Sequence, residues 1–440
     1  MLTYLINLLH TEKILFTSKI FSSNIALAFQ TSFISNCFVL MILFLYLMTA
    51  FYSIGYLNFE KDKRKLRFHI LMFVASLITI CLAYSENLFT AFIFYDLLSV
   101  CTYMLVKHHG DSESEKNALM YLFYLILPSM IFLLPAIIAI YIITGNTNFT
   151  TGGIFNDIPL SSNTINILFL LFIYGISKTA LYPLHKWLIH AMVAPSPVSA
   201  LLHAVLVVKS GLFFMYKVIT EIFGLDILKQ NIHTIWGIYW PVYIACLSII
   251  LAGFSAINSR NIKQRLAYST ISQIGYISMC LFYFSEKAIV AAQLQFLSHS
   301  FAKISLFFYA GYLLSRYSVK NIDELKFRKN HFNAFISIIW LIPVLSLMSM
   351  PLTFGFISKH AITSSVITHP QDIGILFAVV IGIILCILYL FPILYHLINF
   401  SIHNTRFELK NIQILPTLCM YIPTTIISFL IVFSFVILVH

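Results

Sequence analysis

Charged residues are scarce in this sequence. Lys, Arg, Asp and Glu make up 10% of its 440 residues, compared with roughly 25% in an average soluble domain. Acidic residues are the rarer kind, with 16 Asp and Glu against 27 Lys and Arg. The net charge of +11 and the pI near 9.2 would fit a nucleic-acid partner. The basic residues are spread over short loops instead of forming one basic face, which argues against that class of protein.

Motifs for redox, metal or nucleotide chemistry are also missing. The seven cysteines lie in apolar segments without a C-x-x-C pair, so neither an iron–sulfur centre nor a disulfide framework is predicted. The sequence has no Gly-rich phosphate loop and no His/Glu cluster with metal-ligand spacing. We therefore expect no cofactor, no metal site and no catalytic residue for covalent chemistry in this chain.

Long apolar runs dominate instead. Hydrophobic residues make up 60% of the chain and the mean hydropathy is +0.91, which predicts an all-α membrane protein in a lipid bilayer. About twelve segments are long enough to cross ~30 Å of hydrocarbon. They lie near residues 33–57, 68–84, 87–106, 117–143, 162–192, 197–220, 233–256, 266–284, 288–315, 333–363, 373–399 and 412–438.

The loop charges predict the orientation. Loops after the odd-numbered spans hold 18 Lys and Arg, whereas the opposite side holds five. By the positive-inside rule, residues 60–69 and 316–329 face the cytoplasm, and both termini lie outside. The four remaining lysines fall inside spans: Lys178, Lys209, Lys303 and Lys359.

A short internal echo predicts two repeats. ISKTA at 176–180 returns as ISKHA at 357–361, and each copy falls on the fourth helix of a five-helix group. Because five is odd, successive groups enter the membrane from opposite sides, as in transporters built from inverted repeats. The expected division is an interfacial segment (1–30), a first helix with a basic loop (31–67), repeat 1 (68–220), repeat 2 (233–399) and a C-terminal loop and helix (400–440).

Two of these helices are expected to be broken, near Pro183 and Pro351. Pro183 cannot donate a hydrogen bond to the carbonyl of Thr179, so it interrupts the span that carries Lys178. A charge near the bilayer centre costs roughly 2.5–3.5 kcal/mol, and such residues usually face a polar pathway. Lys178, together with Lys209 on the next helix, therefore indicates an ion or proton route.

Asp96 is the one carboxylate well inside a span. Burial disfavours the protonated form of a lysine and a nearby carboxylate favours it, so Asp96 is expected to control proton binding by Lys178 or Lys209. The alternative is a static ion pair that fixes helix packing.

The second repeat offers His299 and Lys303, which share a helix face at i, i+4, and then Lys359. For His299, a hydrogen-bonded core histidine is the alternative. His203 does not share a face with Lys209, so it either serves a neighbouring route or bonds a carbonyl. His185, beside the first break, fits proton uptake or a wet surface equally.

These residues resemble a known family, the proton-pumping, antiporter-like membrane subunits of respiratory complex I and of Mrp-type multisubunit Na+/H+ antiporters. The resemblance covers about residue 30 to the last helix. HAVLVVKSGLFFMYKVITEIFG and KQRLAYSTISQ look most like the D-type member of the Mrp antiporter. The motifs that carry it are SKTALYPLHKWLIHAMVAPSPVSALLHAVLVVKSGLFFMYKV, NIKQRLAYSTISQIGYI, LSHSFAKISLFFYAG and MPLTFGFISKH.

The resemblance implies a proton pathway through matching positions. The family's carboxylate matches Asp96, although the family normally has glutamate there. The family has fourteen helices, and the two without a counterpart here precede the first repeat. The other matching positions are Lys178, Lys209, His299, Lys303 and Lys359.

We therefore expect a proton-translocating subunit of a monovalent cation (Na+)/H+ antiporter. The alternatives are a proton-pumping subunit of complex I, which would make the chain part of an NADH:quinone oxidoreductase, and a non-conducting scaffold. Other membrane subunits would be its partners, with protons and monovalent cations as the transported species. The bacterial inner membrane is the expected location, ahead of the mitochondrial inner membrane.

Overall fold

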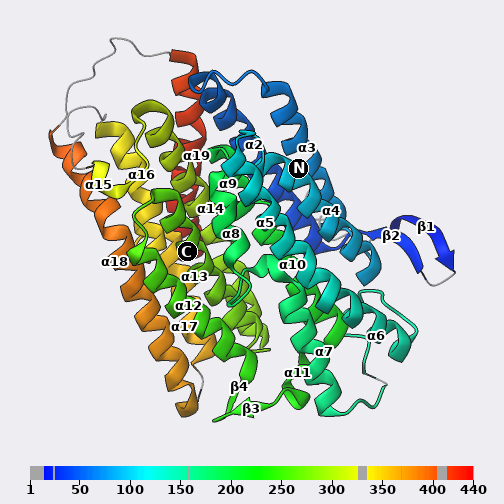
Figure 1. Cartoon of the computed structure of the whole chain (residues 1–440). Helices are drawn as coiled ribbons and strands as arrows, with labels where there is room; N and C mark the ends of the chain where they lie inside the picture. The colour runs from blue at the N-terminus through cyan, green and yellow to red at the C-terminus, as the bar shows by residue number, and fades with distance from the viewer. Residues whose placement is uncertain are drawn as a thin grey trace. The chain divides into compact units, whose positions relative to one another are not determined.

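The computed structural model describes residues 14–22, 25–156, 158–325, 334–367, 369–403 and 414–439, and these are mostly helical (Figure 1). The all-α membrane class is confirmed. One short departure is an antiparallel hairpin of β1 (Ile14–Ser22) and β2 (Ile25–Gln30), in the stretch expected to be interfacial.

The helices group into two compact units. The first comprises residues 1–46, 68–190 and 205–235, and the second comprises 47–67, 191–204 and 236–440. Two long helices near the N-terminus, α2 (Phe33–Phe59) and α3 (Lys65–Ala83), each contribute to both units.

The first unit also contains seven α-helices, three short helical turns and one short strand. They are α4 (Leu88–Val106), α5 (Ser112–Pro128), η1 (Ser129–Leu133), α6 (Leu134–Thr144), α7 (Ser162–Gly175), η2 (Ser177–Thr179), α8 (Lys186–His190), α10 (Val207–Lys217), η4 (Val218–Phe223), α11 (Leu225–Asn231) and β3 (Thr234–Ile235).

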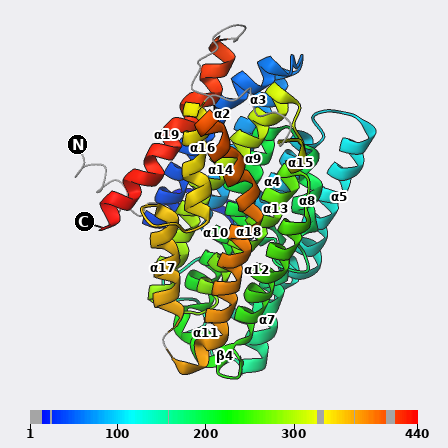
Figure 2. The same ribbon diagram turned by 90° about the vertical axis from the view of Figure 1, so that its left-hand side faces the viewer.

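The second unit holds the remaining elements, several of which are labelled in Figure 2. They are η3 (Ala191–Val193), α9 (Ser196–Ala204), β4 (Ile238–Tyr239), α12 (Trp240–Asn258), α13 (Ile262–Leu281), α14 (Glu286–Tyr317), α15 (Ile322–Leu325), α16 (Ala334–Leu347), α17 (Phe354–Val366), η5 (Pro370–Asp372), α18 (Ile373–His403) and α19 (Ile414–Val439).

Several helices begin at a residue whose side chain caps the first turn. Asn87, Ser161, Asn261 and Ser285 each accept a hydrogen bond from a backbone N–H in the first turn of α4, α7, α13 and α14. Such caps satisfy N–H groups that a helix leaves without a partner. These caps set where each helix starts, and so determine in which helical turn a given residue of that helix lies.

Seven helical segments among the described residues are long and apolar enough to cross a membrane. The expected count of twelve is not confirmed, and parts of the spans expected at 333–363 and 412–438 lie outside the described residues. The seven are Phe33–Phe59, Lys65–Ala83, Leu88–Val106, Ser112–Thr144, Ser196–Phe223, Trp240–Asn258 and Pro370–Ile398.

Both expected interruptions exist, and the first lies between α7 and α8, a stretch that includes Pro183 but begins before it. α7 already ends at Gly175, well before Pro183, so the missing N–H of this proline does not end the helix. The second lies at the expected proline: α16 ends at Leu347 and α17 begins at Phe354, on either side of Pro351. Lys359 therefore sits inside a regular helix, and Lys178 sits in the interruption itself.

Candidate functional site

The interruption after α7 exposes backbone groups that side chains then satisfy. The chain runs through the 3-10 turn η2 and through Ala180, whose φ of 51° is left-handed. The backbone N–H of Lys178 donates to the Tyr95 hydroxyl at 3.0 Å. The indole of Trp187 donates to the carbonyl of Ser177 at 2.9 Å. Because buried backbone groups need partners, these two contacts stabilise the interruption.

Tyr95 also holds the side chain of Lys178. The Lys178 side chain is fully buried. Its amine donates to the Tyr95 backbone carbonyl and lies 3.2 Å from the centroid of the Tyr95 ring. An aromatic face stabilises a cation more strongly where water is excluded. One residue of α4 thus positions both the backbone and the amine of Lys178.

Asp96, the next residue on α4, interacts electrostatically with Lys178. Its two carboxylate oxygens accept hydrogen bonds of 2.8 and 2.9 Å from the Ser129 hydroxyl. No direct ion pair joins Asp96 to Lys178, both of which lie in the described part of the chain. The static ion pair considered as an alternative is therefore not the observed geometry.

Lys209 lies near the same interruption. It is fully buried on α10, two residues before Gly211. A Cβ at Gly211 would lie 2.7 Å from Cβ and 2.8 Å from the carbonyl carbon of Lys178, so α10 touches η2 directly. The three charges expected to act together, Asp96, Lys178 and Lys209, therefore belong to one unit.

In the second unit, Lys303 is fully buried on α14 and reaches α13. Its amine donates to the Leu266 carbonyl at 2.9 Å and to the Ser269 hydroxyl at 2.5 Å. His299, one turn earlier on α14, is fully buried as well. These contacts give Lys303 two oxygen partners and no carboxylate among the residues described here.

His203, on α9, belongs to the second unit with Lys303. Its ring lies 4.6 Å from that of Phe307, and it interacts electrostatically with Lys303. Within the described residues, neither ring nitrogen makes a hydrogen bond, so the carbonyl bond considered for His203 is not observed.

Lys359 is 5% exposed, and its amine lies 2.6 Å from the centroid of the Tyr276 ring. It makes no hydrogen bond to any group in the part of the chain that the structure covers. The second lysine thus keeps the aromatic contact but has neither the carbonyl partner nor the carboxylate neighbour of Lys178.

Two histidines follow the first interruption. The ring of His185 stacks on Tyr182 at 3.7 Å, and the side chain is 9% exposed. His190 shares a 2.8 Å hydrogen bond with Asn117 and stacks on Tyr124 at 5.8 Å. The burial of His185 argues against a wet surface, and its role in proton uptake stays a prediction.

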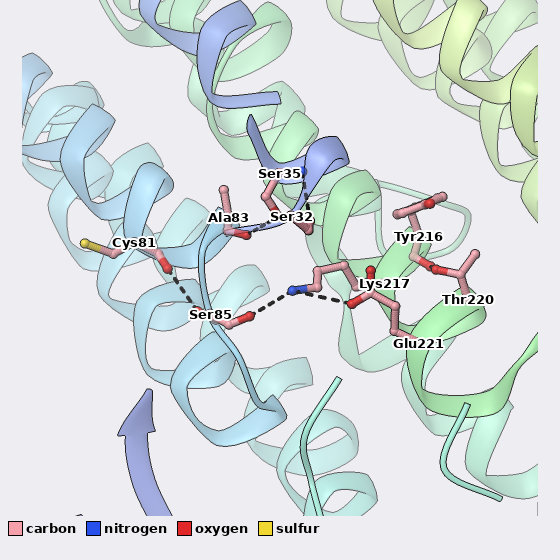
Figure 3. Close-up of polar contacts among 9 residues, drawn as sticks. All are labelled: Ser32, Ser35, Cys81, Ala83, Ser85, Tyr216, Lys217, Thr220 and Glu221. Carbon is pink, nitrogen blue, oxygen red and sulfur yellow. Dashed lines mark hydrogen bonds and ion pairs between the residues drawn. The ribbon is translucent and has the colours of Figure 1, made fainter. Parts of the chain in front are cut away.

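Sequence reasoning missed the environment of Lys217, which it counted among the outer basic residues. The side chain is 6% exposed, and its amine donates to the Ser85 carbonyl at 2.8 Å and pairs with Glu221 at 3.5 Å (Figure 3). It also lies 4.0 Å from the Phe149 ring centroid. The i, i+4 spacing of Lys217 and Glu221 is a signal that would have indicated this pair.

No group of three or more His, Cys, Asp or Glu with a geometry suited to a metal ion occurs within the described ranges. Among the residues predicted to form the pathway, the four buried lysine amines and the Asp96 carboxylate are groups that could bind and release protons.

The comparisons with known proteins agree on the family. The family model described as NADH:quinone oxidoreductase/Mrp antiporter, TM, matches residues 85–386. NADH-quinone oxidoreductase subunit L of Buchnera aphidicola is 30% identical over 83% of this chain and 58% of its own length. The putative antiporter subunit mnhA2 of Staphylococcus haemolyticus is 27% identical over 84% of this chain and 47% of its own.

Other relatives cover less of the chain. The chloroplastic NAD(P)H-quinone oxidoreductase subunit 5 of Nuphar advena is 32% identical over 61% of this chain and 35% of its own length. The chain therefore spans between about a third and three fifths of the length of these relatives. Its assignment to the D-type members of the family stays a prediction.

Two solved assemblies share the fold. A chain of the Mrp complex from Dietzia sp. DQ12-45-1b matches with a TM-score of 0.72 at 18% identity, over 98% of this chain and 45% of that chain. A chain of the membrane-bound sulfane sulfur reductase, an archaeal respiratory membrane complex, matches with a TM-score of 0.75 at 20% identity, over 95% and 83%. The family model matches residues 85–386, which are well over half of this chain. The chain therefore belongs to the NADH:quinone oxidoreductase/Mrp antiporter transmembrane family.

Proposed function

We propose that this chain is a proton-translocating subunit of a multisubunit monovalent cation (Na+)/H+ antiporter. The observation that carries the proposal is the buried lysine at the interruption of the first unit. Lys178 lies against Tyr95, within electrostatic reach of Asp96 and in contact with the helix that bears Lys209. A structural lysine would not need a broken helix and a second buried cation beside it.

The mechanism follows from the competition between burial and charge. Burial favours the neutral amine, and a nearby carboxylate favours the ammonium. Asp96 is held by Ser129 instead of by Lys178, so a rotation of its side chain would change its distance to the amine. Movement of the Asp96 carboxylate toward Lys178 would lead the amine to take up a proton. Return of the carboxylate to Ser129 would lead the amine to release it.

The proposed pathway continues in the second unit. There His299, Lys303 and Lys359 are all buried on α14 and α17, and His203 lies within electrostatic reach of Lys303. Each of these groups binds or releases a proton without a cofactor, which fits conduction.

The partners and location follow from the same proposal. The solved matches are chains of multisubunit assemblies, so other membrane subunits are the expected partners. A bacterial inner membrane is the proposed location, by analogy with the bacterial relatives.

A proton-pumping subunit of complex I is the second candidate, favoured by relatives named as subunits L and 5 of quinone oxidoreductases. Purification of the assembled complex from its host separates the two, since the co-purifying chains would be either antiporter or quinone-reductase subunits. Transport is then measured in inverted vesicles as the collapse of a pH gradient on addition of Na+ or K+. Gradient collapse without electron donors supports the antiporter. A gradient that forms only with NADH and quinone supports complex I. If no protons move under either condition, the result supports a non-conducting scaffold subunit.

A further inference from the structure

The first unit contains a buried ion pair that the proposed pathway does not use. Lys217, the last residue of α10, donates to the backbone carbonyl of Ser85 at 2.8 Å and pairs with Glu221 at 3.5 Å (Figure 3). Ser85 is fully buried in the short turn between α3 and α4. Because a buried charge that loses its partners is strongly unfavourable, the Lys217 amine ties the end of α10 to the turn from which α4 starts.

The loop that carries Phe149 closes over the same amine, which lies 4.0 Å from the centroid of the Phe149 ring. The backbone of this loop is bonded on two sides. The Phe149 N–H donates to the Glu86 carbonyl, before α4, at 2.8 Å, and the Thr150 N–H donates to the Glu221 carbonyl, in η4, at 3.0 Å. The end of α10, the start of α4 and this loop therefore all meet at Lys217.

A line of aromatic rings leads from Lys217 to the proposed pathway. The ring centroid of Phe149 lies 6.5 Å from that of Phe214 on α10, and Phe214 lies 5.7 Å from Tyr95 on α4. Both distances fall in the range of favourable aromatic pairs. Phe214 and Tyr95 are at most 1% exposed, so a shift of one ring displaces the other. Since Tyr95 holds Lys178, the rings connect Lys217 to Lys178.

The form of α10 explains why such an attachment is needed. This helix has 11 residues, begins at Val207 directly after two non-helical residues, and passes into the π-helical turn η4 directly after Lys217. A regular helix therefore does not continue at either end to hold α10 along its axis. Its side contacts must set its position, and turns like η4 are found mostly at functional sites.

We propose that Lys217 is a positioning residue for the contact between Tyr95 and Lys178. Its amine fixes the end of α10 against the turn before α4, which keeps Phe214 packed against Tyr95. The Tyr95 ring then stays beneath the Lys178 amine, in the arrangement in which Asp96 controls the charge of that amine. Lys217 itself neither gives nor takes a proton. This inference rests on the proposed proton transport.

The same unit provides a matched control. Lys229 on α11 pairs with Asp226 at 3.6 Å, but both side chains are exposed, at 40% and 87%. Lys229→Met thus removes a lysine charge from an ion pair between near neighbours on a helix without touching the line of rings. Because exposed ion pairs contribute little, this variant should behave like wild type.

The experiment compares the assembled complexes of wild type, Lys217→Met, Lys217→Arg and Lys229→Met in inverted vesicles. We expect Lys217→Met to slow the cation-driven collapse of the pH gradient by at least about tenfold, because small misplacements of reacting groups reduce rates steeply. Lys217→Arg keeps the charge and the hydrogen-bond donors, so it should recover most of the rate. Lys229→Met should keep the wild-type rate.

A double variant separates positioning from stability. Lys217→Met alone leaves Glu221 without its cation, which destabilises the protein. Adding Glu221→Gln removes the second charge and should restore part of the thermal stability. Transport should stay slow, because the contacts of the amine with Ser85 and Phe149 are still missing. A double variant that recovered the wild-type rate would overturn the proposal, since Lys217 would then have only a structural role.

Phe214→Leu interrupts the line of rings while the ion pair remains, and it tests the proposal even if the Lys217 variants do not assemble. It should slow transport as Lys217→Met does. Wild-type rates in Phe214→Leu or in Lys217→Met would overturn the positioning role and leave the proposed transport standing. Absence of cation-driven transport in wild type would instead overturn the proposed function.

Discussion

Each of the two units contains a buried lysine, and the surroundings of the two lysines are similar but not the same. Lys359 follows Lys178 by 181 positions, and Tyr276 follows Tyr95 by the same 181. In each unit the lysine amine lies over the ring of its tyrosine, at 3.2 Å in the first and 2.6 Å in the second. The repeat predicted from ISKTA and ISKHA therefore extends to a contact between two helices in each unit.

The difference lies in the next residue. Asp96 follows Tyr95, whereas Ile277 follows Tyr276. Lys178 has the Tyr95 carbonyl and an acidic neighbour, and Lys359 has an aromatic face without a hydrogen bond within the described residues. Under the proposed function, the first unit can control the charge of its lysine, and the second must receive protons from elsewhere.

The backbone differs in the same direction. Lys178 lies in the 3-10 turn η2, where its own N–H depends on a side chain for a partner. Lys359 lies within the regular helix α17. The Lys178 backbone thus depends on the Tyr95 hydroxyl instead of on a helical hydrogen bond. Under the proposed function, we place the adjustable step in the first unit.

The largest expected effect comes from removing either lysine. Lys178→Ala and Lys359→Ala should each abolish cation-dependent proton movement in inverted vesicles while the complex still assembles, because no other amine among the described residues lies over the ring of the paired tyrosine. Lys186→Ala changes an exposed lysine and should have a mild effect. If Lys178→Ala transported normally, the lysine would be structural and the scaffold alternative would gain.

The second prediction tests the unequal carboxylate. An opposite charge nearby changes the proton affinity of a group by roughly one to three orders of magnitude, so Asp96→Asn should slow transport at neutral pH by at least about tenfold. Asp96→Glu adds about 1.5 Å of reach and should stay active. Full transport by Asp96→Asn would contradict the proposed switch.

The matching change in the second unit is Ile277→Asp, which places a carboxylate after Tyr276. Since Ile277 is 2% exposed, the new charge would be buried, and Lys359 would be its nearest cationic partner by analogy with the first unit. We expect Lys359 to hold its proton and transport to slow. Faster transport would mean that the second unit lacks only a carboxylate.

The charged residues of both units could be predicted from the sequence, since charges are rare inside apolar spans and each one stands out. Their partners could not. The bond between Asp96 and Ser129 depends on the rotation of two helices, which hydropathy does not determine. The contact of Tyr95 with Lys178 could not be predicted, because a tyrosine in an apolar run is usually a packing residue.

A local rule also could not predict the residue at which the first interruption begins. A proline affects the helix around its own missing N–H, but α7 ends earlier, where Tyr95 and Trp187 offer hydrogen bonds to the backbone. Such competition between helix and side chains is decided by tertiary contacts. Lys217 was misjudged for the opposite reason, because it lies at the end of a span, where hydropathy separates loop from helix poorly.

The third prediction concerns the glycines that allow each lysine segment to pack. A Cβ at Gly211 would lie 2.7–2.9 Å from atoms of Lys178 and Thr179, and one at Gly355 would lie 1.7 Å from the Ser346 carbonyl oxygen. Overpacking typically costs about 1–3 kcal/mol. Gly211→Ala and Gly355→Ala should each lower the thermal stability of the purified complex, Gly355→Ala the more. Gly145→Ala, at a glycine with open space around it, controls for the change of residue type, although its φ of 67° adds some strain. Equal stability in all three variants would contradict the close packing.

The smallest effect separates the two tyrosines, whose rings play the same part and whose hydroxyls do not. The Tyr95 hydroxyl accepts from the buried backbone N–H of Lys178, which has no helical partner in η2. The Tyr276 hydroxyl donates to the Val379 carbonyl at 3.1 Å, and this carbonyl lies inside α18, where the helix also engages it. Leaving a buried donor without a partner costs about 1–3 kcal/mol, whereas losing one ordinary hydrogen bond costs about 0.5–1.5 kcal/mol.

Tyr95→Phe should therefore destabilise the protein more than Tyr276→Phe in thermal unfolding. Both variants keep the ring beneath the lysine and should continue to transport. If Tyr276→Phe were the more destabilising change, the interruption at Lys178 would not depend on the tyrosine hydroxyl, and the asymmetry between the two units would rest on Asp96 alone.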